Sequence, residues 1–246
     1  MMLQMTLPLI GRRSEIERLR NSVRKRESLL VLGPAGSGKT ALVRVVVDED
    51  VVYLRYPATL HDLLIDLARA LLQLGHRSFL GLARPAGDLD HWLSRQTSVH
   101  LKGLLCTSLE AEPRAIILDG IDRASFPTYR FLQRLYFAKG MALVATARDA
   151  ICLGTLGRLF WDPRATLQLE PLNHADSMRL FDIAADEFGL RNLDVQEFRD
   201  KVLESARGNP GQIVEMCRMA SNPMYVSGRH IKFAPLRIDV LTRFLA

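Results

Sequence analysis

A glycine-rich segment of eight residues, GPAGSGKT, constrains the fold of this chain more than any other feature. It runs from Gly33 to Thr40 and fits the pattern G-x-x-x-x-G-K-[ST], between the apolar run Ser28–Leu32 and the helix-forming run Ala41–Val47. Glycines let the backbone curl so that successive N–H groups face one anion, and the N-terminus of the following helix adds partial positive charge. The order strand, loop and helix therefore predicts a phosphate-binding loop.

The side chains at the end of this segment predict how a nucleoside triphosphate is held. Lys39 is expected to reach the β- and γ-phosphates, and the hydroxyl of Thr40 is expected to bind Mg²⁺. The predicted nucleotide-binding residues of the segment are Gly33, Pro34, Ala35, Gly36, Ser37, Gly38, Lys39, Thr40 and Ala41.

An acid ends the apolar run Arg114–Asp119, RAIILD, which has the character of a buried parallel strand. The carboxylate of Asp119 is expected beside the phosphate loop, where it can orient Mg²⁺ through water. Thr40 and Asp119 are therefore the predicted metal ligands. Many hydrolysing ATPases of this layout carry Glu at the next position, which is Gly120 here. The following acid, Asp122, is either the base that polarises the attacking water or only the opening residue of the next helix.

Helical and strand periods alternate along the chain, which predicts an α/β fold with a parallel sheet. After Pro171 only helical patterns follow, so we predict a P-loop NTPase core at residues 1–171, a small all-helical lid at 172–222 and an unassigned tail at 223–246. The predicted strands are 28–32, 50–56, 114–119, 141–147 and 165–169. The predicted helices are 14–26, 41–47, 58–74, 91–109, 126–138, 175–188, 195–206 and 210–220, with a short final helix at 235–245 and a long surface loop at 75–90.

Composition limits where the chain acts and what it contacts. Its three cysteines are scattered without a CxxC pair, as expected in a reducing compartment, and no run approaches the roughly 18 uncharged apolar residues of a membrane span. We therefore expect a cytoplasmic protein with no membrane partner. The net charge of +6 and a basic run permit contact with DNA, but a solvated helix face explains the run better, since no aromatic residues interleave. The basic run is Arg18, Arg20, Arg24, Lys25 and Arg26.

Five elements in order resemble a known family. They are Leu9-Ile10-Gly11-Arg12-x-x-Glu15-x-x-x-Leu19, the phosphate loop, Ile116–Asp119, Thr146-Ala147-Arg148 and Gly208-Asn209-Pro210. Over roughly residues 9–220 the chain resembles an AAA+ ATPase. Within that family it is similar to the signal-transduction ATPases with numerous domains (STAND) and to related archaeal-type, origin-recognition and transposition-regulator ATPases.

The resemblance implies ATP and Mg²⁺ as cofactors and assigns further site residues. Ile10 and Gly11 would lie against the adenine with Arg12 nearby, and Pro210 would pack on the adenine from the lid. Arg148, in the sensor 1 position, would contact the γ-phosphate. The implied catalytic residues are thus Lys39, Asp119, Asp122 and Arg148.

The resemblance also implies how the ATPase acts. A chain that is nearly a bare ATPase core would work through a protein partner or a homo-oligomer, in which a neighbour can supply an arginine finger. Arg158 and Arg164 lie in the expected interval, and both can equally be loop arginines with no such role. Arg207 is either a substitute for the sensor 2 arginine or a solvated helix residue.

Three functions follow from these features. The first is an Mg²⁺-ATP-dependent ATPase that drives a partner or its own assembly. The second is a DNA-associated ATPase of the transposition or origin-recognition type. The third, suggested by Gly120, is a nucleotide-binding switch that does not hydrolyse ATP.

Overall fold

The computed structural model describes residues 7–84, 87–121 and 124–245. They form two compact units, one of residues 14–33 and 39–168 and the other of residues 7–13, 34–38 and 169–245. We call these the sheet unit and the helical unit. Among the described helices, none combines the length and the apolar character needed to cross a membrane.

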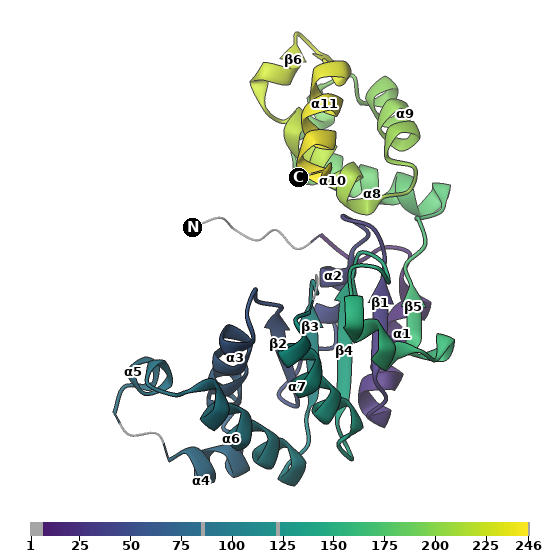
Figure 1. The fold of residues 1–246 in the computed structure, drawn as a ribbon. Helices are drawn as coiled ribbons and strands as arrows, with labels where there is room; N and C mark the ends of the chain where they lie inside the picture. Colours follow the sequence, from purple (N-terminus) through teal and green to yellow (C-terminus); the bar gives the residue numbers. More distant parts are fainter. Residues whose placement is uncertain (1–6, 85–86, 122–123, 246) are drawn as a thin grey trace. The chain divides into compact units, whose positions relative to one another are not determined.

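The sheet unit is built on five parallel strands in the order β2-β3-β4-β1-β5 (Figure 1). Every residue of β1, β3 and β4 is buried, as expected for a parallel sheet covered on both faces. This architecture confirms the predicted P-loop NTPase fold of the AAA+ type. The strand bounds are β1 Leu29–Leu32, β2 Val51–Arg55, β3 Ala115–Asp119, β4 Ala142–Ala147 and β5 Thr166–Gln168.

Because all five strands run in the same direction, their carboxyl ends share one edge of the sheet. Gly33 follows β1, Asp119 ends β3, and Arg148 follows β4. The topology therefore brings the ends of three strands that carry predicted site residues to one edge.

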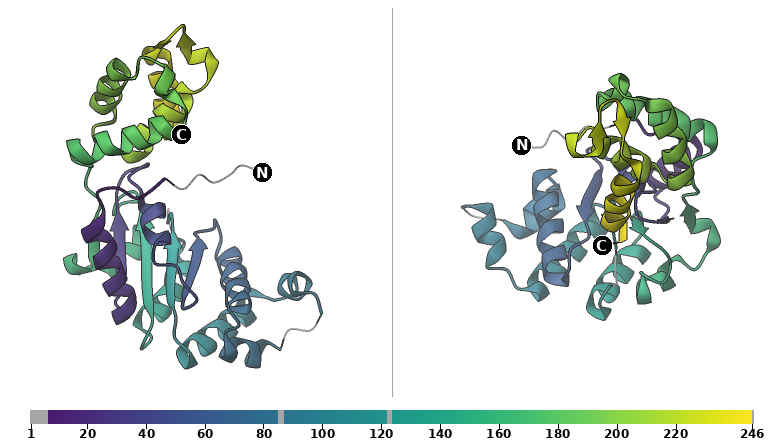
Figure 2. Two further views of the ribbon diagram at one scale, coloured as in Figure 1. Left: turned by 180° about the vertical axis from the view of Figure 1, so that it is seen from behind. Right: turned by 90° about the horizontal axis from the view of Figure 1, so that it is seen from above.

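Helices cover both faces of this sheet. Figure 1 shows α7 (Phe126–Phe137) on the near face, and the view from behind in Figure 2 shows α1 (Arg13–Lys25) and α2 (Lys39–Arg44) on the other. The helix α3 (Leu60–Gln73) contacts β2 and packs against α6 (Ser98–Ala111). Short 3-10 helices follow β4 at Gly154–Phe160 and Pro163–Ala165.

Two predictions for residues 75–109 are wrong. The expected surface loop at 75–90 contains the helix α4 (Arg77–Ala83), and the expected helix 91–109 is divided into α5 (Leu89–Ser94) and α6. Side-chain caps explain both errors, because each cap satisfies backbone N–H groups at a helix start. The capping residues are His76 for α4, Asp88 for α5 and Thr97 for α6.

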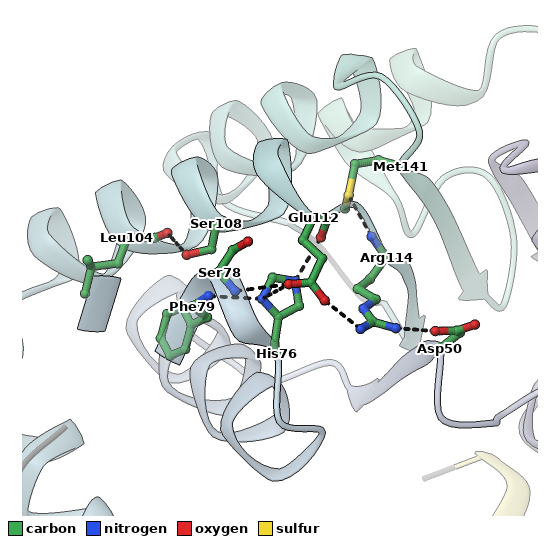
Figure 3. Close-up of polar contacts among 9 residues, drawn as sticks. All are labelled: Asp50, His76, Ser78, Phe79, Leu104, Ser108, Glu112, Arg114 and Met141. Atoms are coloured by element: carbon green, nitrogen blue, oxygen red, sulfur yellow. Dashed lines mark hydrogen bonds and ion pairs between the residues drawn. The ribbon is translucent and has the colours of Figure 1, made fainter. Parts of the chain in front are cut away.

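His76, which is completely buried, joins α4 to the end of α6 (Figure 3). Its Nδ1 accepts a hydrogen bond from the N–H of Phe79 at 3.1 Å, and its Nε2 donates to the carbonyl of Glu112 at 2.8 Å. The carboxylate of Glu112 accepts from the N–H of Ser78 at 3.0 Å and from Arg114 at 2.8 Å. Arg114 also pairs with Asp50, so this network ties α4, α6 and the starts of β2 and β3 together.

The helical unit contains α8 (His174–Glu187), α9 (Val195–Ala206), α10 (Pro210–Ala220) and α11 (Phe233–Leu245). The stretch that the sequence left unassigned holds a short antiparallel pair, β6 (Val226–Ser227) and β7 (His230–Ile231), before α11. Two short 3-10 helices lie at Leu190–Asn192 and Pro223–Tyr225. The core of this unit includes rings of Phe181 and Phe198 at 5.9 Å between centroids.

Candidate functional site

Asp119 lies at the carboxyl edge of the sheet with both carboxylate oxygens engaged. Oδ1 accepts a hydrogen bond from the hydroxyl of Thr146 at 2.7 Å, and Oδ2 accepts one from the hydroxyl of Tyr53 at 2.8 Å. The Thr146 hydroxyl in turn accepts from the N–H of Gly120 at 2.7 Å. Asp119 is only 5% exposed, so the two hydroxyls replace water for a buried charge.

Lys39, the first residue of α2, lies within electrostatic reach of this carboxylate. Its ammonium donates to the carbonyl of Gly33 at 2.5 Å. Burial lowers the pKa of Lys39, the negative charge of Asp119 opposes that shift, and the positive charge of Arg148 adds to it. Asp119 and Arg148, two of the four predicted catalytic residues, thus lie close enough to a third, Lys39, for their charges to act on it.

The remaining predicted residues of the sheet unit differ in how much the structure says of them. Thr40 is exposed in the first turn of α2, and Arg148 is exposed just after β4. Gly120 is in a left-handed conformation with φ of 80°. Asp122 lies outside the described residues.

Oxygen ligands at this edge fit Mg²⁺. Within the described ranges, no group of three or more histidine, cysteine or acidic side chains could hold a metal ion. Mg²⁺ in nucleotide sites needs only one or two protein oxygens, since phosphates and water complete its shell. The hydroxyl of Thr40 and the carboxylate of Asp119 are oxygen donors of the kind that Mg²⁺ prefers.

The helical unit contains a cavity of about 480 Å³ beside the loop residues Pro34 and Ser37. Arg12 and Pro210, both predicted to lie near the base, line it. Ile10 is not among the lining residues and belongs to the helical core instead. The other lining residues are Leu169, Glu170, Pro171, Lys201, Glu204, Ser205, Ala206, Arg207, Gly208, Asn209, Gln212, Phe233, Arg237 and Leu241.

Two hydroxyls in this cavity lack a hydrogen bond. The Oγ atoms of Ser37 and Ser205 are buried and have no hydrogen-bond partner among the described residues. A buried hydroxyl left unpaired costs free energy, so a cavity that holds two of them is suited to a polar ligand. A volume of this size is also typical of small-molecule sites.

Arg12 helps to shape the cavity and is itself buried. Its guanidinium donates to the carbonyl of Glu170 at 2.7 Å and lies 3.5 Å from the carbonyl of Ser37. Arg207 ends α9 in a left-handed conformation with φ of 46° and lines the same cavity as Pro210.

The loop segment Pro34–Gly38 packs closely on the start of α10. The side chain of Asn209 caps α10 and donates to the carbonyl of Ala35 at 2.8 Å, and the N–H of Gly211 donates to the carbonyl of Gly36 at 2.8 Å. A Cβ at Gly211 would lie 2.6 Å from the Cα of Gly36. Only glycine allows this approach of two backbones.

The arginine-finger candidates differ in their contacts. The guanidinium of Arg164 is paired with Asp162 at 3.0 Å, and its carbonyl accepts from Arg18 at 2.7 Å. Arg158 is exposed in the 3-10 helix Gly154–Phe160, and its side chain has no ion pair within the described ranges.

Sequence reasoning missed the two hydroxyls that hold Asp119 and the contribution of α11 to the cavity. Thr146 was visible only as part of the motif that ends in Arg148, and Tyr53 only as one residue of a predicted strand. Neither position signals a partner, because the contacts join three strands that are far apart in the sequence.

Comparisons with known proteins identify the family and the fold. A family model described as an AAA ATPase domain matches residues 8–142, more than half of the 246 residues. A search of curated proteins found no match.

Solved structures share the fold at low identity. A STAND protein with a tetratricopeptide repeat sensor from Pyrococcus horikoshii is 17% identical, with a TM-score of 0.56 over 97% of this chain and 33% of that one. The Walker-type ATPase of Pyrococcus abyssi is 16% identical, with a TM-score of 0.62 over 96% of this chain and 71% of that one. The Orc1 protein of Aeropyrum pernix, solved in complex with DNA, is 17% identical, with a TM-score of 0.64 over 96% and 66%.

The similarity to these structures shows the fold alone. The chain spans only a third of the length of the first of them. The phosphate-loop motif, the parallel sheet with its acidic strand end and the matched family model lead to one assignment. The chain belongs to the AAA ATPase domain family.

Proposed function

We propose that this protein binds Mg²⁺-ATP and hydrolyses it to drive a partner or its own assembly. The observation that carries the proposal is the charge cluster of Lys39, Asp119 and Arg148 at the carboxyl edge of the sheet. Two cations beside the phosphate loop suit the negative charge of a triphosphate, and the buried carboxylate suits its metal ion. Bound Mg²⁺ supplies charge neutralisation of the β- and γ-phosphates.

In this proposal each residue has a separate task. Lys39 holds the β- and γ-phosphates, and the backbone of Gly33–Thr40 surrounds them. Thr40 and Asp119 hold the metal ion directly or through water. Arg148 detects the γ-phosphate, because an exposed cation at a strand end gains a partner only while that phosphate is present.

The cavity beside Pro34 and Ser37 is proposed to take the base and ribose. Pro210 offers an apolar surface for the ring, and the unpaired hydroxyls of Ser37 and Ser205 offer polar contacts. Ile10 is proposed to act indirectly, by packing in the core that supports Gly11 and Arg12.

A thermal-shift measurement tests nucleotide binding. A ligand at a hundred times its dissociation constant stabilises a fold by about 2.7 kcal/mol. ATP with Mg²⁺ should raise the melting temperature of the wild type, and Lys39→Ala should abolish that shift while leaving the unliganded protein folded. The exposed Lys139, changed to Ala, is the matched control. An undiminished shift in Lys39→Ala contradicts the proposal.

Assembly of copies is proposed to complete the site through Arg158. Its guanidinium is available, whereas that of Arg164 is paired with Asp162. If Arg158 acts in a neighbour, mixing Lys39→Ala protein with Arg158→Ala protein should restore some turnover that neither variant has alone. No recovery on mixing contradicts a finger supplied by another copy.

A DNA-associated ATPase is the second candidate, and a groove lined by three arginines favours it. Arg20, Arg24 and Arg26 line a groove of about 410 Å³ together with Asp48 and Asp50, and within the described residues none of the three arginine side chains makes an ion pair. Arg18 is not available for this role, because it donates to the carbonyls of Arg164 and Thr166. The fold is also similar to that of the Orc1 protein, which was solved in complex with DNA.

Salt dependence tests this candidate. Each phosphate neutralised on duplex DNA contributes about −0.9 to the log–log slope of affinity against salt. Charge reversal at Arg20, Arg24 and Arg26 should flatten that slope and weaken all sequences alike, while the ATP-induced thermal shift remains. Absence of salt-dependent DNA binding in the wild type decides for a protein partner.

A further inference from the structure

The Asp119 carboxylate is held on two sides by neutral hydroxyls from neighbouring strands. Thr146 of β4 donates to Oδ1 at 2.7 Å, and Tyr53 of β2 donates to Oδ2 at 2.8 Å. Thr146 belongs to a motif already assigned to the phosphate edge. Tyr53 has no assigned role, although its hydroxyl donates to Oδ2, the carboxylate oxygen that Thr146 does not contact.

Rotation of an aspartate carboxylate about its last torsion is intrinsically soft. Terminal torsions between sp³ and sp² atoms have broad minima, so the rotamer alone does not fix where the two oxygens point. One donor restrains one oxygen, and a second donor from the opposite side defines the plane. Each oxygen keeps a further lone pair that can accept a metal-bound water.

Tyr53 is also joined to α2, the helix that begins with Lys39. The guanidinium of Arg44, the last residue of α2, lies 5.5 Å from the centre of the Tyr53 ring. A cation over an aromatic face at this distance is attracted to it. The hydroxyl of Tyr53 thus contacts the carboxylate, and its ring contacts the end of α2. Burial lowers the pKa of Lys39 at the start of α2, and the charge of the same carboxylate opposes that shift.

We propose that Tyr53 is a positioning residue that orients Asp119 toward Mg²⁺ and keeps the carboxylate in register with α2. The inference rests on the proposed function, because it takes Asp119 as the acid that holds the metal ion. Tyr53 does not touch the phosphates in this proposal. Its effect on the metal site passes through the hydrogen bond from its hydroxyl to Asp119.

Tyr53→Phe tests the inference with the least change of shape. The variant keeps the ring beneath the guanidinium of Arg44 and loses the hydroxyl, which interacts with Asp119 and also with Arg44. We expect the Mg²⁺ concentration at half-maximal stabilisation, measured by thermal shift with a non-hydrolysable ATP analogue, to rise about tenfold, the size expected for one hydrogen bond to a charged group. The Mg²⁺ midpoint of turnover should rise in parallel. Affinity for the analogue without Mg²⁺ should stay unchanged.

Tyr56→Phe is the matched control. Tyr56 lies just after β2 in the same unit, and its hydroxyl interacts with Thr128 instead of Asp119. This variant loses one tyrosine hydroxyl from the same stretch and should leave the Mg²⁺ midpoint where it is in the wild type.

The outcomes separate the inference from the proposal on which it rests. If the wild type shows Mg²⁺-dependent stabilisation and Tyr53→Phe has the same midpoint, Tyr53 is structural and the inference is overturned alone. A lower melting temperature of the unliganded variant with an unmoved midpoint has the same meaning. If the wild type itself shows no stabilisation by the analogue with Mg²⁺, both the nucleotide proposal and the inference are overturned.

Discussion

Thr146, the residue before the last of β4, donates a hydrogen bond of 2.7 Å from its hydroxyl to the carboxylate of Asp119, the last residue of the neighbouring strand β3. Thr146 is completely buried, and the same hydroxyl accepts from the N–H of Gly120 at 2.7 Å. One side chain therefore fixes the acidic strand end and the turn that follows it. The stability and the chemistry of this edge depend on the same contact.

Thr146→Val is expected to weaken both. Valine keeps the shape and removes the hydroxyl, so Asp119 loses a donor and the unfolding free energy should fall by about 1–3 kcal/mol. Denaturant unfolding and the Mg²⁺ dependence of turnover check the change. Thr166→Val, on the edge strand β5, should leave both within error, and equal losses in the two variants would contradict a specific role for Thr146.

Gly211→Ala is expected to reduce nucleotide affinity through the loop. The added methyl would lie 2.6 Å from the Cα of Gly36 and 2.9 Å from its carbonyl oxygen, so backbone must move. The displaced segment Pro34–Gly38 is the one proposed to surround the phosphates. Titration of a fluorescent ATP analogue checks this effect.

Gly81→Ala is the control for that substitution. A Cβ at Gly81 meets nothing within 4 Å, and the residue lies inside α4. Alanine there should stabilise the protein by about 0.5–1 kcal/mol and leave affinity unchanged. If Gly211→Ala binds the analogue as the wild type does, the close approach of the loop to α10 has no part in binding.

Asp119→Ala should abolish Mg²⁺-dependent turnover, since it removes the proposed metal-binding carboxylate. Asp122→Asn decides the question that the sequence left open. A base acts in the transition state, so its loss lowers kcat without weakening ATP binding. Unchanged turnover in Asp122→Asn assigns it to the start of the next helix.

Glu112→Gln is expected to make the unfolding free energy less dependent on pH in the acidic range. Hydrogen bonding from the N–H of Ser78, with a further contribution from Arg114, lowers the pKa of Glu112 below its ordinary value of 4.5. An acid whose folded pKa is lowered stabilises the fold above the unfolded pKa, and that contribution is lost as the pH falls through the folded pKa. The variant should therefore be less stable at neutral pH, and the difference should shrink below about pH 4.5.

Thermal unfolding at a series of pH values measures this difference. Glu27→Gln, at an exposed position of the same unit, provides the control and should show no comparable dependence. A gap between Glu112→Gln and wild type that stays constant from neutral pH to pH 3 would contradict the argument.

Local sequence patterns were enough to predict much of the fold. The spacing of Gly33, Gly38, Lys39 and Thr40 specifies a loop whose conformation depends mainly on glycine and on the helix that follows. The apolar run that ends in Asp119 specifies a buried parallel strand, because strands covered on both faces have no polar positions to alternate. The parallel sheet and the helical stretch after Pro171 followed from the same periods.

The errors arose where a short capping contact overrides a composition pattern. Gly75, Gly81 and Gly87 suggested a loop, yet the buried His76 starts a helix inside it by accepting from the N–H of Phe79. The other ring nitrogen donates to the carbonyl of Glu112, 36 residues away, and so leaves Nδ1 as the acceptor.

The sequence by itself determined which residues are proposed to meet phosphate and metal, since those roles depend on residue type and local spacing. Only the tertiary structure decided what holds them: Tyr53 on Asp119, Gly211 against Gly36, and α11 in the wall of the cavity. The physical reason is that these contacts join residues far apart in the sequence. Tyr53 and Asp119 are separated by 66 positions, and Asn209 and Ala35, at the same contact of the loop with α10, by 174. Hydrogen bonds and van der Waals contacts at such separations depend on how the strands and helices pack, which no local pattern records.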